Sequence, residues 1–488
     1  MLFIDMNKKI LLSTIWACAM ASSAMALPQL SPLFSDHMVL QQQTDAPIWG
    51  TAKPNKKVTL VASWNNQKVI VKADAKGNWK AHLQTPKAGG PFQISISDGK
   101  SILLNDVMIG EVWLCSGQSN MEFPVKGWSQ VLNADREVAE ANHKGIRLLQ
   151  IHKVAAEEPS QKVIANSDTW QECSSQSVPE FSAVAYFFAR ELNQKTGIPV
   201  GVIDATWGGS NIESWISKST LQYAPQFTDS IARKDYHPWR NSPTALWNGM
   251  IHPLVPFAMK GICWYQGEQN ELRGYEYRDL FPMLISDWRK QWEKDDMPFY
   301  FVQLANFHAR KDEPTEALWA EMREAQEMAL HVKNTGMVVT DDIGEGDNVH
   351  YPNKQEVGRR LALIALAKCY HAKDAVYWGP RCLDYTIDGN KIILKMEPAG
   401  GLQVKGGKLR NFTIAGADHK FHQAEARIEG NNIVVWSKNV PFPLAVRYAW
   451  QDNPDIELFN HFGLPASTFR TDDWPGLSFG KNRLNSEY

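Results

Sequence analysis

The sequence predicts an α/β fold in which a parallel sheet is sandwiched by helices and flanked by two β-rich domains. Three observations support it: period-two apolar runs near the N-terminus, strand-like runs alternating with helical patterns from Val107 onward, and short β runs after about His371. A chain of 488 residues has room for two to four domains at roughly 100 to 200 residues each. We therefore expect domains at 27–105, 106–370 and 371–488.

Residues 27–105 are predicted to form a small antiparallel β-domain. Segments of alternating polarity at 58–61, 68–71 and 92–96 are separated by turn clusters such as Lys53-Pro54-Asn55. Period-two alternation turns one face of a strand to the core and the other to solvent. No obvious catalytic cluster occurs in this stretch.

The middle of the chain predicts the parallel sheet. Its strand-like runs lie at 107–115, 146–151, 200–205, 261–265, 299–304 and 337–340. Amphipathic stretches between them imply right-handed βαβ units with helices on both faces. The helix at 183–195 should end at Gly197, and the helix at 354–369 begins with a capping box, Asn353 and Glu356. Pro282 interrupts the helical spacing of 280–288, so we expect a kink or a later start there.

Composition and charge make some partners improbable. The 51 Lys plus Arg against 53 Asp plus Glu leave a net charge of −2, so no global field would attract nucleic acid. We expect no stable membrane insertion, and the sequence leaves the oligomeric state open. Cys115 and Cys263 lie in apolar runs and should be buried thiols, whereas Cys369 and Cys382 are close enough in sequence to form a disulfide.

Residues 1–26 have the features of a secretory signal peptide. Met6-Asn7-Lys8-Lys9 precedes an apolar stretch that ends near Met20, and Ala24-Met25-Ala26 is an A-x-A cleavage site. We expect an exported protein, periplasmic or secreted, with cleavage after Ala26. Lipidation at Cys18 is the weaker alternative, because Ile15-Trp16-Ala17 fits a lipobox poorly.

Polar, glycine-rich segments follow four of the predicted strands, at 116–121, 206–211, 266–270 and 341–350. Ligands of open parallel sheets bind at the carboxyl ends of the strands, so these segments should converge on one site. They supply a hydroxyl, a histidine with nearby carboxylates, backbone amides freed by glycine, and carboxamides, which together can perform acyl transfer. Met121 replaces the second glycine of a G-x-S-x-G elbow, and no H-E-x-x-H or His/Asp cluster predicts a catalytic metal.

These motifs resemble those of the SGNH hydrolase superfamily, and more closely the sialate O-acetylesterase family of carbohydrate esterases. The segment 110–122, GEVWLCSGQSNME, is similar to the family's nucleophile block. The segment 264–270, WYQGEQN, is similar to its third block, with Gln269 where Ser is usual. The last block departs from the family pattern, because Asn348 stands two residues before His350 and the acidic residue, Asp347, stands three before it. The resemblance extends over nearly the whole mature chain.

The resemblance implies an SGNH-type sheet and a serine esterase that removes O-acetyl groups from sugars, above all from 9-O-acetylated sialic acids. Ser119 would be the nucleophile, His350 the general base and Asp347 the acid that orients it, with Asp342 as a substitute. No metal or organic cofactor is implied. The partner would be an acetylated sugar.

The resemblance also implies the groups around the reacting carbonyl. The oxyanion would meet the backbone amides of Ser119 and Gly209 and a carboxamide, either Asn270 or Gln266. Further candidates contact the substrate or brace the loops: Gln118, Trp207, Glu213, Trp215 and Glu268. Two alternatives stay open, an acetylxylan or other polysaccharide O-acetylesterase and a non-catalytic carbohydrate-binding protein.

Overall fold

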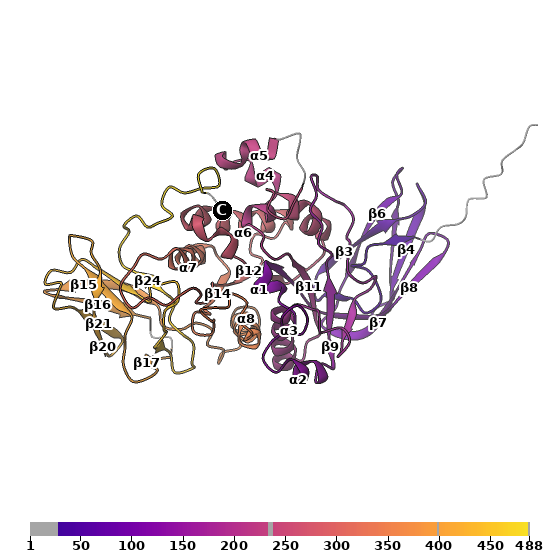
Figure 1. Ribbon diagram of the computed structural model, residues 1–488. Coiled ribbons are helices and arrows are strands. Elements are labelled where there is room, and N and C mark those ends of the chain that lie inside the picture. The colour runs from indigo at the N-terminus through magenta and orange to yellow at the C-terminus, as the bar shows by residue number, and fades with distance from the viewer. Residues whose placement is uncertain (1–27, 233–237, 398–399, 487–488) are drawn as a thin grey trace, which may run out of the picture.

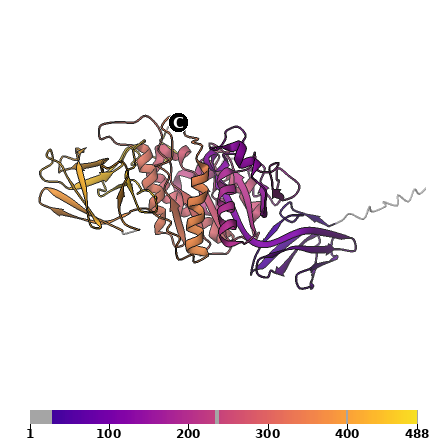
Figure 2. The ribbon, with the colours of Figure 1, turned by 90° about the horizontal axis from the view of Figure 1, so that it is seen from below.

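The computed structural model describes residues 28–232, 238–397 and 400–486 (Figure 1). A β-rich part, an α/β part and a second β-rich part follow one another along the chain. Figure 2 shows the two β-rich parts at opposite ends of the α/β part. The predicted signal peptide lies outside the described residues.

The N-terminal part is built from short strands in two sheets. These are β1 (Gln29–Leu30), β2 (Val39–Gln41), β3 (Asp45–Thr51), β4 (Lys57–Ala62), β5 (Gln67–Lys72), β6 (Asn78–Gln84) and β7 (Gly89–Ser97). β1, β3 and β6 form one antiparallel sheet, and β4 pairs with β5 and β7 in the other. The three strands predicted here are β4, β5 and β7, and burial along β4 alternates as its sequence pattern requires.

Strand β8 (Ser101–Gly117) joins the N-terminal part to the α/β part without interruption. Its first half pairs with β7 and β2, and its second half pairs in parallel with β11 (Val200–Thr206) and β12 (Gly261–Tyr265). The predicted boundary between residues 105 and 106 therefore lies inside a continuous strand. The long ribbon of β8 can be followed in Figure 2.

The sheet of the α/β part contains all six predicted strands. Besides β8, β11 and β12, these are β9 (His143–Gln150), β13 (Phe299–Val302) and β14 (Thr335–Val338). The order is β10-β9-β11-β8-β12-β13-β14, and only the edge strand β10 (Gln171–Cys173) runs antiparallel to its neighbour. Every residue of β11, β12 and β13 is buried, which is expected when helices cover both faces.

Four long helices cover this sheet. α3 (Ala183–Thr196) packs on α8 (Lys354–Cys369), and α6 (Gly274–Gln291) packs on α7 (Leu318–Met328). Figure 1 shows the two pairs on opposite sides of the sheet. Shorter helices are α1 (Ser119–Glu122), α2 (Ala134–Ala139), α4 (Lys218–Leu221) and α5 (Thr228–Ala232).

The predicted helix ends are mostly confirmed. The side chain of Asn353 accepts a hydrogen bond from the amide of Glu356 at 3.3 Å, and Gly197 ends α3 with φ of 69°. Of the two alternatives predicted at Pro282, a kink or a later start, the later start was wrong, because α6 begins at Gly274 and includes Pro282. Tyr277 is fully buried, so the apolar stripe extends into the first turn and outweighs the single backbone hydrogen bond that proline removes.

The C-terminal part has its own apolar core between two four-stranded sheets. One sheet contains β15 (Cys382–Asp388), β16 (Lys391–Met396), β21 (Asn432–Trp436) and β20 (Glu425–Glu429). The other contains β19 (His422–Gln423), β18 (Phe412–Ala415), β22 (Ala445–Tyr448) and β24 (Phe469–Arg470), and a separate pair is β17 (Gln403–Val404) with β23 (Leu458–Phe459).

The last residues return to the α/β part. The amides of Leu477 and Ser478 donate to the buried carboxylate of Glu321, and Arg483 pairs with the buried Glu213 at 2.9 Å. The amide of Arg483 also donates to the carboxylate of Glu276 on α6 at 3.3 Å.

The cysteines of the described part are free thiols. Cys115 and Cys263 are buried, as predicted, and the candidate disulfide between Cys369 and Cys382 is not formed. Within the same residues, no helix is long and apolar enough to cross a membrane.

Candidate active site

Ser119 lies at the carboxyl end of the central strand of the sheet. β8 ends at Gly117, and Ser119 is the first residue of α1. Gly117 has φ of +138°, and a Cβ there would lie 2.1 Å from the carbonyl oxygen of Tyr265 on β12, so only glycine fits this turn. With β11 on one side and β12 on the other, Ser119 stands where ligands of such sheets bind.

His350 lies within hydrogen-bond distance of Ser119. The distance from Nε2 of His350 to Oγ of Ser119 is 2.9 Å, although 231 residues separate the two in sequence. The ring of Trp128 packs edge-on against the imidazole at a centroid distance of 5.2 Å. Burial and the nearby charge of Lys354 lower the pKa of His350, which favours the neutral form that can accept a proton.

The structure does not join either candidate acid to His350. Asp347 is exposed, and no hydrogen bond joins it to the imidazole among the described residues. Its loop is held by Asn348, which bonds to Glu345 and accepts from the amide of His350. Both carboxylate oxygens of Asp342 accept from Arg360, at 2.7 and 2.8 Å.

The backbone amides predicted for the oxyanion are not used elsewhere in the described structure. No hydrogen bond there has the amide of Ser119 or Gly209 as its donor. A Cβ on Gly208 would lie 3.2 Å from Cβ of Ser119, so the loop after β11 packs directly against Ser119. Glu122 fixes this loop by accepting from the amide of Gly208 at 2.6 Å.

The two candidate carboxamides are buried beneath this loop. Nε2 of Gln266 donates both its protons, to the carbonyl of Ser210 and to Oδ1 of Asn270, and has none left for a substrate oxyanion. Asn270 donates from Nδ2 to Glu213 and accepts from the amide of Ile212. Of the two, Asn270 alone keeps a donor proton that has no partner among the described residues.

The remaining candidates mainly brace the loops. Oε1 of Gln118 accepts from the amide of Gln269 at 3.2 Å, Trp215 is fully buried, and Glu213 lies between Arg273 and Arg483. Trp207 is half-buried, and its ring lies 6.0 Å from that of Trp239. Of these four side chains, only that of Trp207 is not buried.

Sequence reasoning missed a buried hydrogen-bond network beside Ser119. Nδ2 of Asn120 donates to Glu268 at 2.6 Å and to the carbonyl of Val349 at 3.1 Å, and its Oδ1 accepts from Nζ of Lys354 at 2.7 Å. Asn120 therefore connects the residue after Ser119 to the residue before His350. Burial holds the pKa of Lys354 well below its ordinary value and raises that of Glu268. The sequence could have indicated Asn120, because it lies in the segment 110–122 that resembles the family's nucleophile block. No sequence pattern indicated Lys354.

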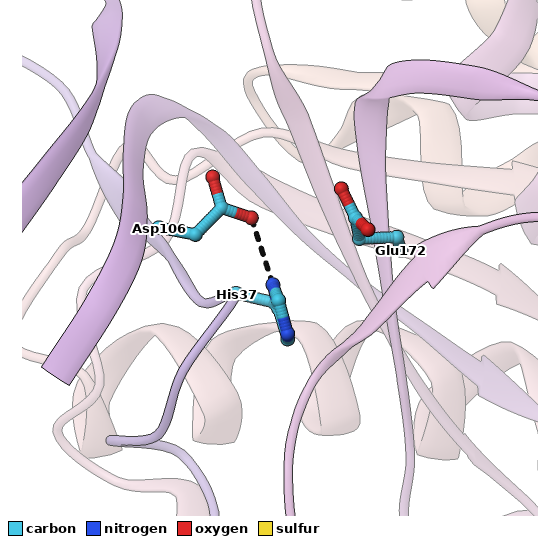
Figure 3. A group of neighbouring side chains, drawn as sticks. All are labelled: His37, Asp106 and Glu172. Carbon is cyan, nitrogen blue, oxygen red and sulfur yellow. Dashed lines mark hydrogen bonds and ion pairs between the residues drawn. The ribbon is translucent and has the colours of Figure 1, made fainter.

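One group of possible metal ligands lies elsewhere in the described part. His37, Asp106 and Glu172 offer ligand atoms within 4.8 Å of one another (Figure 3). Nη2 of Arg147 lies 2.9 Å from Asp106 and 3.4 Å from Glu172, so one guanidinium pairs with both carboxylates and offsets part of their charge.

Comparison with known proteins agrees with this geometry. The model of the family described as carbohydrate esterase, sialic acid-specific acetylesterase, matches residues 109–367, a little over half of the chain. The chain is 29% identical over 489 residues to the sialate O-acetylesterase of Homo sapiens, covering 91% of this chain and 92% of that one. It is 30% identical over 413 residues to the sialate O-acetylesterase of Pongo abelii, covering 78% of each.

A solved structure of another protein is similar to this chain over nearly the whole length of both. The crystal structure of a carbohydrate acetylesterase from Xanthomonas citri has a TM-score of 0.84 and 39% sequence identity, covering 92% of this chain and 100% of that one. These likenesses are to enzymes, so they do not favour the alternative of a non-catalytic binding protein. The chain thus belongs to the carbohydrate esterase family of sialic acid-specific acetylesterases, and it is a carboxylic ester hydrolase of O-acetylated carbohydrates.

Proposed function

We propose that this enzyme removes O-acetyl groups from 9-O-acetylated sialic acids by an acetyl-enzyme mechanism at an SGNH-type site. The observation that carries the proposal is the 2.9 Å contact between Oγ of Ser119 and Nε2 of His350. Such a pair is the arrangement by which a general base activates a hydroxyl nucleophile. The names of the human and orangutan relatives favour sialate as the substrate.

In the first half of the reaction, Oγ of Ser119 attacks the acetyl carbonyl carbon while Nε2 of His350 accepts its proton. The carbonyl oxygen becomes an oxyanion, which the amides of Ser119 and Gly209 can stabilise with the free proton of Asn270. Losing one donor of this kind costs about 2.7 to 4 kcal/mol in the transition state. When the tetrahedral intermediate collapses, the ester C–O bond breaks and the imidazolium returns its proton to the sugar oxygen.

In the second half, water replaces the sugar. His350 takes a proton from the water as its oxygen attacks the acetyl-Ser119 carbonyl, and the same amides stabilise the second oxyanion. Collapse releases acetate and returns the proton to Ser119. Since neither Asp347 nor Asp342 bonds to the imidazole, this mechanism rests on the serine–histidine pair.

The test is a panel of acetylated sugars with two variants. Wild type should release acetate from 9-O-acetyl-N-acetylneuraminate with a higher kcat/KM than from acetylated xylan. Ser119→Ala should retain no more than about a hundredth of the wild-type activity. Ser174→Ala is the matched control, because Ser174 bonds within its own surface turn. Preference for acetylated xylan would replace the proposed substrate, and an active Ser119→Ala would remove Ser119 as the nucleophile.

We also propose that the protein is exported, periplasmic or secreted. The support is the sequence of residues 1–26, with its basic start, apolar stretch and Ala24-Met25-Ala26 site. N-terminal sequencing of the mature protein should begin at Leu27. A first residue of Met1, or of Cys18 with a lipid attached, would contradict this.

A further inference from the structure

A short turn carrying Trp239 and Arg240 is fixed against the loop that follows β11. The amide of Ser242 donates to the carbonyl of Trp239 at 2.9 Å, and the amide of Trp239 donates to Oγ of Ser242 at 3.1 Å. Oδ1 of Asn241 accepts from the amide of Asn211 at 3.0 Å. The residue after Arg240 is thus hydrogen-bonded to Asn211, which lies two residues beyond Gly209.

The guanidinium of Arg240 lies over Gly209. A Cβ on Gly209 would lie 3.3 Å from Nη2, 3.4 Å from Cζ and 3.4 Å from Nε of Arg240. These nearly equal distances mean that the planar face of the group, not one tip, faces the glycine. Because a Cβ on the neighbouring Gly208 would lie 3.2 Å from Cβ of Ser119, the guanidinium lies over the same short loop that packs against Ser119.

Arg240 has no acid partner in the described part of the chain, where it makes no ion pair and no hydrogen bond. Its Nε is buried and without a partner, and its contact is with the Trp239 ring, 5.1 Å from Cζ. By contrast, the buried arginines Arg273, Arg360 and Arg447 each pair with a carboxylate. A held but uncompensated guanidinium offers a fork that matches a carboxylate.

Aromatic faces accompany this charge. Trp239 is 55% exposed, and its ring lies at 68° to that of the half-buried Trp207. A sugar ring can pack on such a face while an acidic substituent reaches the arginine. The nucleophile, an aromatic wall and an unpaired cation therefore occupy neighbouring positions.

We propose that Arg240 is a specificity-determining residue that binds the carboxylate of an acetylated sugar acid, so that the enzyme selects acidic over neutral acetylated sugars. The inference rests on the proposed function, because it assigns a substrate contact at the same site. It differs from a role in oxyanion stabilisation, which would affect every acetyl ester alike.

The experiment compares each acid with its own neutral analogue. Acetate release is measured for 9-O-acetyl-N-acetylneuraminate and its C1 carboxamide, and for an O-acetylated hexuronic acid and its carboxamide. Wild type should prefer the acid in at least one pair. Arg240→Gln should lower that acid-to-amide ratio of kcat/KM by about 10- to 100-fold, the range expected for hydrogen bonds to a charged group, mainly through KM. Arg240→Lys should restore part of it.

Two controls keep the result interpretable. Arg427→Gln makes the same exchange on the exposed strand β20, beside Trp436, and should leave the ratio at the wild-type value. Thermal unfolding shows whether Arg240→Gln is folded. If it is not, the acid-to-amide ratio of Arg240→Lys is compared with that of wild type instead.

An unchanged ratio in Arg240→Gln would overturn the inference, as would equal losses on acid and amide. So would a wild-type enzyme that treats acid and amide alike, and that result would leave the esterase function standing. If wild type released acetate from none of the sialate or hexuronate substrates but did so from acetylated xylan, the proposed function itself would fail.

Discussion

Replacing Asn120 by alanine removes the connection between the nucleophile and the histidine loop. Nζ of Lys354, which is fully buried, would lose its hydrogen-bond acceptor, and Glu268 would lose the donor to Oε1 while its Oε2 already has no partner. Leaving one buried polar group without its hydrogen-bond partner costs about 1 to 3 kcal/mol, and here two groups lose a partner, so the total should be about 2 to 6 kcal/mol. We expect the free energy of unfolding to fall by that amount.

Urea denaturation followed by tryptophan fluorescence measures this loss. Asn248→Ala is the matched control, because Asn248 is equally buried but donates to the backbone carbonyls of residues 156 and 157. We expect about 1 to 3 kcal/mol there. We also expect kcat of Asn120→Ala to fall about 10- to 100-fold, since small misplacement of reacting groups has effects of this size.

A double-mutant cycle with Lys354→Met tests the reasoning itself. Once Nζ of Lys354 is gone, Asn120→Ala no longer leaves it without an acceptor, so the double variant should be more stable than the two separate losses predict, by about 1 kcal/mol or more. Losses that add to within about 0.5 kcal/mol would refute the network as described.

Four further results are expected. Asp347→Asn should lower kcat less than about tenfold, and a fall near 10⁴-fold would show that this carboxylate does orient His350 during turnover. Because burial and a nearby cation lower the pKa of His350, and only its neutral form accepts the serine proton, the acid limb of kcat/KM should have its midpoint below about 6.5; a midpoint above that value would contradict the assignment. Arg483→Gln should lower the free energy of unfolding by about 1 to 3 kcal/mol because it takes one of two arginines from Glu213, and unchanged urea unfolding would mean that the tail contributes nothing. A sulfonyl fluoride should inactivate the enzyme through Ser119 while a chelator should not, and activity that zinc restores after chelation would exclude the serine mechanism.

Sequence reasoning placed the strands and the serine–histidine pair because strand ends in a parallel sheet must meet at one edge. Ser119 and His350 each follow a strand, so topology alone brings them near one another. A tight turn at Gly209 could also be anticipated from the sequence. Gly209 has a positive φ, which is costly for residues other than glycine.

The sequence could not reveal how the side chains share their hydrogen bonds. Lys354 occupies the first turn of an amphipathic helix, where lysine is usually solvated, yet it lies against the ring of Tyr351 at 3.5 Å. The direction of Asp347 depends on the turn that Asn348 forms with Glu345, and spacing along the chain does not encode it. Arg240 follows no periodic pattern, and its role depends on which glycine it covers.

The uninterrupted strand β8 has a consequence for any attempt to recombine this enzyme with others. An accessory domain joined by a linker can be exchanged as a cassette, but here the N-terminal part and the nucleophile share one hydrogen-bonded strand. A chimera that swaps residues 28–105 would replace the first five residues of β8, 101–105, together with its partner strands β2 and β7. The pairing register of the replaced segment would then determine the position of Ser119 relative to the ends of β11 and β12. Donor proteins with a different strand length should therefore yield folded but inactive hybrids.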